Sequence, residues 1–330
     1  MTNRPALRAL LTLPFLTLTA APVLAQSNVS LSGFLDVGVF RGFDKVKNVG
    51  TIQRSNLAFS GSEDLGDGLA ATFKLSTRFD LDTGATEGAG AKPFWQGEST
   101  VGLKGAFGAV RFGRALDVVS ANDWAYDPWY NFNRVASPAW QFWHYNYASD
   151  RTSNNGSAEY GRLANGVFYD SPSFGGFAAH LSGAFENSNT APGSGTGNNF
   201  GASLNYDQGP VSAMLAHSKN SSGDKVTFVG GKYTVGSFQI MGAYDTSTFV
   251  APVESKAKVV TLGAVYSFGL TSLKLGLGRL DVDGAKTNFV GLGADYLLSK
   301  RTTLYVSAGR NDPKGGSASS AYGAGISHSF

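Results

Sequence analysis

The stretch "LAATFKLSTRFD", residues 69–80, decides the fold because apolar and polar side chains alternate along it. One face would carry Leu69, Phe73, Leu75 and Phe79, and the other Thr72, Lys74, Ser76, Arg78 and Asp80. A period of two is typical of a β-strand that has one apolar and one polar face.

The same alternation recurs along the rest of the chain. It is clear in "NVSLSGFLDVGVF" (28–40), "FAAHLSGAFE" (177–186) and "VVTLGAVYSF" (259–268), and no segment after residue 28 has a persuasive helical period. Seven short connections, such as "GAFGA" and "DQGP", alternate with eight long or polar ones at 41–50, 81–97, 115–157, 187–198, 219–224, 249–257, 281–286 and 311–319. Fifteen connections join sixteen strands.

An even number of strands, with short turns at one end and longer loops at the other, is typical of a bacterial outer-membrane barrel. Strands of about ten residues can cross a bilayer when tilted, and only a closed barrel satisfies the backbone of a sheet in lipid. A soluble β-sandwich or propeller is disfavoured because the apolar face has little partner surface and the other face is too polar for a core. We therefore expect an all-β protein with a 16-stranded antiparallel transmembrane β-barrel.

The first 25 residues differ from the rest. Arg4 and Arg8 precede a mostly apolar run, and "PVLAQ" ends it, which predicts a signal peptide (1–25) cleaved after Ala25 and a barrel over 26–330. Without Arg4 and Arg8 the 27 basic residues become 25 against 24 acidic ones, and the net charge falls from +3 to +1. The total charge therefore does not indicate a nucleic-acid partner. The lack of cysteine excludes disulfides and thiol chemistry.

Four motifs together carry a family resemblance. "SGSEDLGDGL" (60–69), "TVGLKGAFGAVRFGR" (100–114), "GVFYDSPSFGGF" (166–177) and the terminal "AYGAGISHSF" resemble the Gram-negative general porins of the β-proteobacterial type. The resemblance implies a sixteen-stranded barrel in the outer membrane, a homotrimer, and a third long loop folded inward. It also implies that Tyr322 and the final Phe330 form a signal read by the barrel-assembly machinery.

The third long connection, residues 115–157, is the longest, and the resemblance makes it the constriction loop. Its segment "WAYDPWYNFNRVASPAWQFWHYNY" (124–147) holds four of the five tryptophans. Its rings could pack between loop and wall, form a stacking surface for solutes, or contact a neighbouring subunit. The expected constriction residues are Asp117, Asp123, Asp127, Arg134, Trp140 and Trp143.

The polar strand faces predict a basic ladder in the pore. The alternation turns inward Arg54, Lys74, Arg78, Lys104, Arg111 and Arg162. Arg114 would share the side of Phe112, but a bulge at Gly113 could turn it inward, and the resemblance implies inward arginines at Arg114 and Arg162. The similar porins usually have another arginine where this chain has Asn56. These cations, facing the loop acids, predict a transverse field and a weak anion preference. The alternative is that several of these charges pair with one another or lie in wide vestibules.

No motif indicates an enzyme, a cofactor or a metal. The four histidines lie far apart, and neither G-x-S-x-G nor H-E-x-x-H occurs. The expected function is passive diffusion of small hydrophilic solutes through a water-filled channel, with outer-membrane lipid and lipopolysaccharide as surroundings. The alternatives are a substrate-selective channel that uses the aromatic loop as a binding platform, and a plugged barrel acting as adhesin or receptor.

Overall fold

The computed structural model describes residues 28–87, 90, 93–144, 161–185, 199–220, 223–250 and 253–330. The expected signal peptide and residues 145–157 of the expected constriction loop lie outside these residues. No helix within the described ranges is long and apolar enough to cross a membrane.

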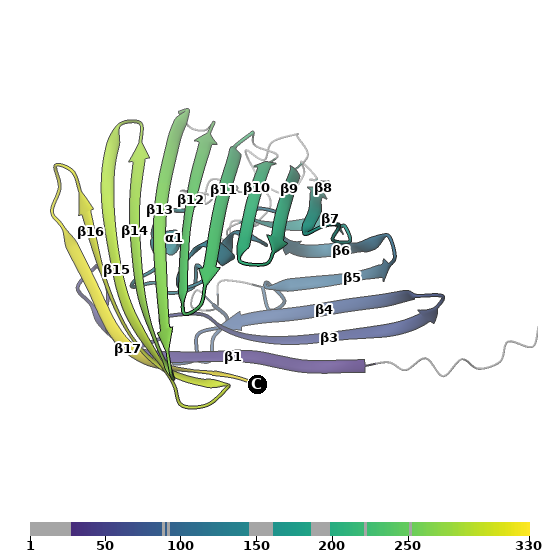
Figure 1. The fold of residues 1–330 in the computed structure, drawn as a ribbon, viewed down its shortest axis with the longest axis horizontal. Helices are drawn as coiled ribbons and strands as arrows, with labels where there is room; N and C mark the ends of the chain where they lie inside the picture. The colour runs from purple at the N-terminus through teal and green to yellow at the C-terminus, as the bar shows by residue number, and fades with distance from the viewer. Residues whose placement is uncertain are drawn as a thin grey trace, which may run out of the picture.

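The described chain is nearly all β-strand (Figure 1). The strands are β1 (Asn28–Arg41), β2 (Lys47–Gly50), β3 (Ser55–Gly66), β4 (Leu69–Phe79), β5 (Glu98–Gly105), β6 (Gly108–Leu116), β7 (Arg162–Asp170), β8 (Phe177–Ala184), β9 (Asn199–Gln208), β10 (Val211–Lys219), β11 (Lys225–Val235), β12 (Phe238–Phe249), β13 (Ser255–Phe268), β14 (Thr271–Val282), β15 (Ala285–Leu297), β16 (Thr302–Pro313) and β17 (Ser319–Ser329). Two short helical turns, η1 (Asp123–Tyr126) and α1 (Pro138–Phe142), lie between β6 and β7.

The sheet closes on itself through its first and last strands. β1 pairs antiparallel with β17 over Phe34–Arg41, and the last residue extends this ladder, because Gly33 N donates to Phe330 O and Phe330 N to Gly33 O, both at 3.1 Å. The expected sixteen-stranded antiparallel barrel is confirmed. Seventeen strands are numbered, but β2 does not occupy a separate position around the barrel. The lower part of β1 (Asn28–Phe34) pairs with β3 and its upper part (Gly38–Arg41) with β2, so these two strands share one edge.

The alternation of the sequence becomes an outward apolar face. On β14, Leu273, Leu275 and Leu277 are each 39% exposed or more, whereas Gly276 and Gly278, which alternate with them, are buried. Such exposure is costly in water but is what a lipid-facing wall requires.

The expected short turns are also confirmed. The polar connection at 281–286 is tighter than expected: Asp283 and Gly284 both have positive φ and form a two-residue hairpin.

The largest buried cluster joins the segment after β6 to strands β10–β15. It contains Tyr126, Phe142 and Trp143 from that segment, packed with Phe228 of β11 and Phe289 of β15. The segment lies on the strand face opposite the exposed leucines, and glycines allow its close approach. A Cβ at Gly291 or Gly309 would collide with the carbonyl oxygens of Ala136 and Val135, respectively. The backbone of this irregular segment therefore rests directly on the wall.

Candidate functional site

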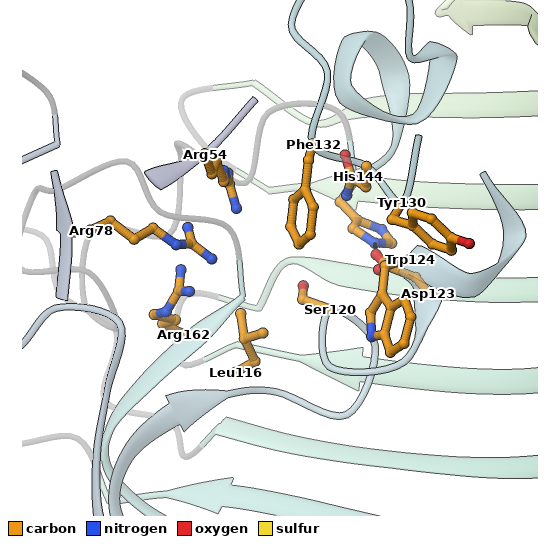
Figure 2. Close-up of a pocket in the computed structure, with 11 residues that line it drawn as sticks. Arg54, Arg78, Leu116, Ser120, Asp123, Trp124, Tyr130, Phe132, His144 and Arg162 are labelled. Atoms are coloured by element: carbon orange, nitrogen blue, oxygen red, sulfur yellow. Dashed lines mark hydrogen bonds and ion pairs between the residues drawn. The ribbon is translucent and has the colours of Figure 1, made fainter. Parts of the chain in front are cut away.

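Three arginines from separate parts of the chain line one cavity of about 240 Å³ (Figure 2). Arg54 lies between β2 and β3, Arg78 is near the end of β4, and Arg162 begins β7. The opposite side is formed by the segment after β6, with Trp124, Tyr130 and Phe132. We call this space the aromatic cavity. Arg54 was expected on a strand, but it precedes β3 because residues 51–54 turn back toward β1.

A buried carboxylate on β1 holds that returning segment. Asp36 is fully buried, and its Oδ1 accepts hydrogen bonds from Ile52 N at 2.9 Å and Gln53 N at 2.7 Å. Its Oδ2 accepts from the Tyr305 hydroxyl of β16 at 2.6 Å. The Arg54 guanidinium then lies over the Trp140 ring, 4.7 Å from its centroid. Asp36 therefore positions Arg54 although it does not line the cavity.

Glu87, in the loop after β4, contacts three arginines. Its carboxylate oxygens lie 3.8 Å from Arg54 Nε, 3.8 Å from Arg78 Nη1 and 3.4 Å from Arg134 Nη2. Arg162 is oriented separately, by a 2.7 Å hydrogen bond from Nε to Gly97 O. Glu87 therefore neutralises part of the positive charge beside the cavity. Glu87 was missed because no periodicity marks a side chain in a loop.

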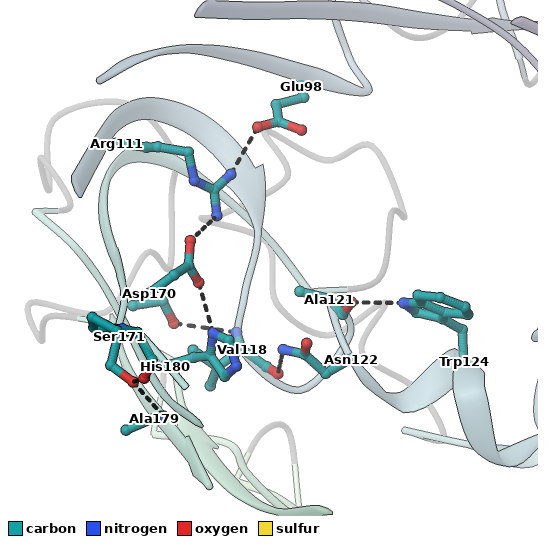
Figure 3. A network of polar contacts seen from close by, with 12 residues as sticks. Glu98, Arg111, Val118, Ala121, Asn122, Trp124, Asp170, Ser171, Ala179 and His180 are labelled. Atoms are coloured by element: carbon teal, nitrogen blue, oxygen red, sulfur yellow. Dashed lines mark hydrogen bonds and ion pairs between the residues drawn. The ribbon is translucent and has the colours of Figure 1, made fainter. Parts of the chain in front are cut away.

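A second cavity, of about 270 Å³, adjoins the first and shares Arg78, Leu116 and Arg162 with it. We call it the polar cavity, since its further lining includes Lys74, Glu98 and Arg111. Here the cations are paired. Lys74 Nζ lies 2.9 Å from Glu98 Oε2. Arg111 contacts Glu98 at 2.8 Å and Asp170 at 3.1 Å (Figure 3). Lys74 and Arg111 are thus ion-paired, and Arg54 and Arg78 are too, through Glu87; this is the pairing that the alternative expected.

The two remaining ladder residues line neither cavity. Lys104 is exposed, and its backbone lies opposite Ala70 on β4 and Ala109 on β6. Arg114 pairs with Ser99, on the strand face of the exposed Phe112, and its Nε donates to Gln96 O at 3.1 Å. Gly113 does have a positive φ of 129°, and the β6–β7 register shifts there. At this register shift, two steps along β6 (Gly113 to Ala115) lie opposite three steps along β7 (Gly166 to Leu163). The extra residue is therefore on β7, and Arg114 stays on the strand face of Phe112.

The expectation that all three early loop acids face the basic ladder is wrong. Asp127 is buried, and its Oδ2 accepts from Trp129 N, Asn131 N and the Ser137 hydroxyl. Asp117 is buried too and accepts from Ser120 N at 2.8 Å. Burial raises the pKa of both carboxyls, against the lowering effect of these donors. An irregular backbone has unpaired N–H groups, and these two acids satisfy them.

Asp123 does line the aromatic cavity, but its carboxylate is paired with His144, which also lines it. His144 Nε2 lies 2.6 Å from Asp123 Oδ2, and Nδ1 lies 2.6 Å from Asp245 Oδ2 on β12. Burial alone would lower the pKa of His144, but the two carboxylates outweigh it and raise the pKa to about 10. At neutral pH an imidazolium therefore bridges the loop segment and the wall. The sequence contained no signal for a contact between residues 101 apart.

The aromatic residues of the segment divide into two groups. Trp143 is buried, its ring Nε1 donates to Thr261 Oγ1 at 3.1 Å, and it packs edge-on against Phe228. It braces the loop against the wall, and Trp140 packs against Arg54 and Arg134. In contrast, Trp124, Tyr130 and Phe132 are each at least 36% exposed, at the aromatic cavity. The exposed group, which the sequence did not single out, is the one that solutes could contact.

The two residues of the expected assembly signal lie on the outer face of β17 and at its end. Tyr322 is 55% exposed and Phe330 39% exposed. The Phe330 ring lies against Gly33, where a Cβ would collide with it. No group of three or more potential metal ligands is found within the described ranges.

These features define the class of protein: a closed, lipid-compatible β-barrel that encloses charged cavities. The model of the Gram-negative porin family matches residues 10–316, and the chain belongs to that family.

Similar proteins support the assignment. Outer membrane porin protein 32 of Delftia acidovorans is 31% identical, with 90% of this chain and 87% of that protein covered. Major outer membrane protein P.IB of Neisseria lactamica is 27% identical, with 96% and 98% covered. The anion-selective porin from Comamonas acidovorans has a TM-score of 0.78 at 26% identity, with 92% of this chain and 100% of that chain covered. The protein is thus a porin with an outer-membrane location.

Proposed function

We propose that this porin is an anion-preferring diffusion channel narrowed by residues 115–157, which fold into the barrel as a constriction loop. Support comes from the contacts of the segment after β6 with β11–β16, on the strand face opposite the exposed leucines. The similar Comamonas protein is described as anion-selective. Small hydrophilic solutes would pass without a catalytic step, as the fold and family are those of channels, not enzymes.

The observation that carries the anion preference is the shared boundary of the two cavities. Arg78 and Arg162 line both, facing Leu116 of the expected loop. A solute moving from one cavity to the other would pass two guanidinium groups, with Arg54 close by. Fixed charges at the narrowest zone act where screening by salt is weakest, and therefore set selectivity.

The test is the reversal potential in planar bilayers under a KCl gradient. Arg78→Gln and Arg162→Gln should each lower the chloride-to-potassium permeability ratio by about twofold, the scale of a partly screened charge at a few ångströms. Arg301→Gln, in the exposed turn before β16, is the matched control and should change nothing. A cation-preferring wild type, or equal effects of all three variants, would refute the proposal.

We further propose a homotrimer that inserts through the barrel-assembly machinery and is surrounded by outer-membrane lipid, including lipopolysaccharide. Exposed large apolar side chains occur around the barrel, on β1–β6 and β8–β17, which suits contact with lipid or with other subunits. Native mass spectrometry of the detergent-purified protein should give three copies of the chain. A monomer that still conducts would contradict this assembly.

The second candidate is a substrate-selective channel. Exposed rings beside the arginines favour it, because a purely general pore needs no aromatic surface next to its charged residues. It predicts a current block that saturates with solute concentration.

A further inference from the structure

We propose that the aromatic cavity is a binding subsite for single-ring aromatic carboxylates of the benzoate type. The inference rests on the proposed anion-conducting channel and names the solutes that it would retain and pass preferentially. It follows from two chemically different walls, one cationic and one aromatic, that face the same small space (Figure 2).

The cationic wall suits a carboxylate. Arg54, Arg78 and Arg162 converge on the cavity from three separate parts of the chain (Figure 2). Arg162 is held in orientation by its hydrogen bond to Gly97 O. Guanidinium groups offer planar, paired N–H donors that match the two oxygens of a carboxylate. The arrangement therefore fixes the end of the cavity at which the charged group of a solute would lie.

The opposite wall suits a flat ring. Phe132, Trp124 and Tyr130 expose their rings although most bulky side chains of this segment are packed against the barrel. Trp124 and Tyr130 lie 5.9 Å apart between ring centroids and are tilted by 58°, so they form an angled surface instead of a closed stack. Arg54 lies 5.8 Å from the Phe132 centroid, which connects the two walls. A planar π-system between them would contact rings and guanidinium faces at once.

The size of the cavity limits the occupant. Its volume of about 240 Å³ is below the range of roughly 300–1,000 Å³ that holds drug-sized ligands. A single ring with one carboxylate fits that limit better than a fused or multi-ring solute. Short aliphatic acids would satisfy the arginines and leave the exposed rings in water.

The test measures block of the chloride current by three solutes in bilayers that contain the wild-type protein. Benzoate carries charge and ring, cyclohexanecarboxylate carries charge and bulk without a π-system, and benzyl alcohol carries the ring without charge. Benzoate should block saturably, with an affinity about fivefold above that of cyclohexanecarboxylate, the size expected of one aromatic contact. Benzyl alcohol should not block. Equal affinities of the two carboxylates would overturn the inference.

Substitutions of the exposed rings test whether the preference for benzoate arises in the aromatic cavity. In the double variant Trp124→Leu with Phe132→Leu, the preference for benzoate over cyclohexanecarboxylate should disappear. Phe174→Leu, which removes an exposed ring in the short turn between β7 and β8, is the control and should keep the preference. A preference that survives the double variant would overturn the assignment to this cavity. The solute comparison on wild-type protein remains decisive even if the double variant does not fold.

The reversal potential separates this inference from the proposed function. A channel that prefers chloride but does not distinguish the two carboxylates retains the proposed function and overturns the subsite. A channel without anion preference overturns the proposed function and the subsite that rests on it.

Discussion

His144 and Asp245 are joined at two points. The Asp245 Oδ2 atom accepts a hydrogen bond from the backbone N of His144 at 2.9 Å and lies 2.6 Å from its ring Nδ1. His144 has a positive φ of 50°, which is unfavourable for its side chain, so the contacts hold a strained residue in place. The pair connects the segment after β6 to β12, and Asp123 completes it from η1.

This connection should make the stability of the segment fall as the pH rises into the alkaline range. The pKa of His144 is raised from 6.5 to about 10 in the folded protein, so its imidazolium contributes fully below about pH 6.5. The contribution declines above that pH and is lost as pH rises through about 10. We expect the temperature of the heat-induced mobility shift on gels to fall over this range, and His144→Gln to flatten the profile. His217→Gln, on an exposed side chain of β10, is the control and should leave the fall intact.

Removing the partner carboxylate should be more damaging than changing pH. Asp245→Asn would leave an imidazolium at a fully buried site with one carboxylate fewer, at a cost of about 3–5 kcal/mol for breaking a buried ion pair. The free energy of barrel unfolding in urea, measured by tryptophan fluorescence at pH 7, should fall accordingly. Asp207→Asn, on an exposed position of β9, should not change it. A loss below about 1 kcal/mol would show that the pair is not a main anchor of the segment.

The contact between loop backbone and barrel wall gives a steric prediction. A side chain at Gly291 would collide with Ala136 O, so Gly291→Ala should displace the loop and cost about 1–3 kcal/mol through overpacking. Single-channel recordings should show altered conductance and more current noise. Gly231→Ala on β11 is the matched control, because a Cβ there meets no atom within 4 Å. Normal conductance of both variants would place the conducting path away from this contact.

The barrel was predictable from sequence because each strand repeats the same period-two constraint, and seven short turns divide the chain at regular intervals. β2 was missed since it is only four residues long and lies inside a polar loop. Arg78 and Arg162 line both cavities, and alternation assigned both to the polar strand face, because it fixes the side of a strand residue.

The irregular segment was predictable only in outline. Its position as the third long connection was correct, but Asp117 and Asp127 form hydrogen bonds within it, and the exposed rings are Trp124, Tyr130 and Phe132. No period specifies which side chains of such a segment are buried, because that depends on contacts with distant strands. Glu98 could have been predicted from the sequence as an inward-facing residue, since it shares a strand face with Thr100 and Lys104.

Asp36 should control the position of Arg54 without touching solute. In Asp36→Asn, the Ile52 and Gln53 backbone donors and the Tyr305 hydroxyl would lose a charged acceptor, and residues 51–54 should loosen. We expect a lower chloride preference together with noisier current. Tyr305→Phe removes one of these donors and should have a smaller effect in the same direction. An unchanged reversal potential in Asp36→Asn would show that Arg54 is positioned by its contacts with Trp140 and Glu87 instead.

Glu98 should reduce the anion preference in the wild type, so removing its charge should increase that preference. Its carboxylate contacts both Lys74 and Arg111, and neutralises part of the positive charge in the polar cavity. Glu98→Gln should raise the chloride-to-potassium permeability ratio by about twofold at low salt, and by less near 1 M salt, where screening shortens the range of the field to about 3 Å. Glu254→Gln is the control: its carboxylate is exposed and paired with Lys256 at 3.1 Å, in the loop before β13. A ratio that falls in Glu98→Gln would mean that Glu98 mainly holds the two cations in place, and that their orientation matters more than the net charge.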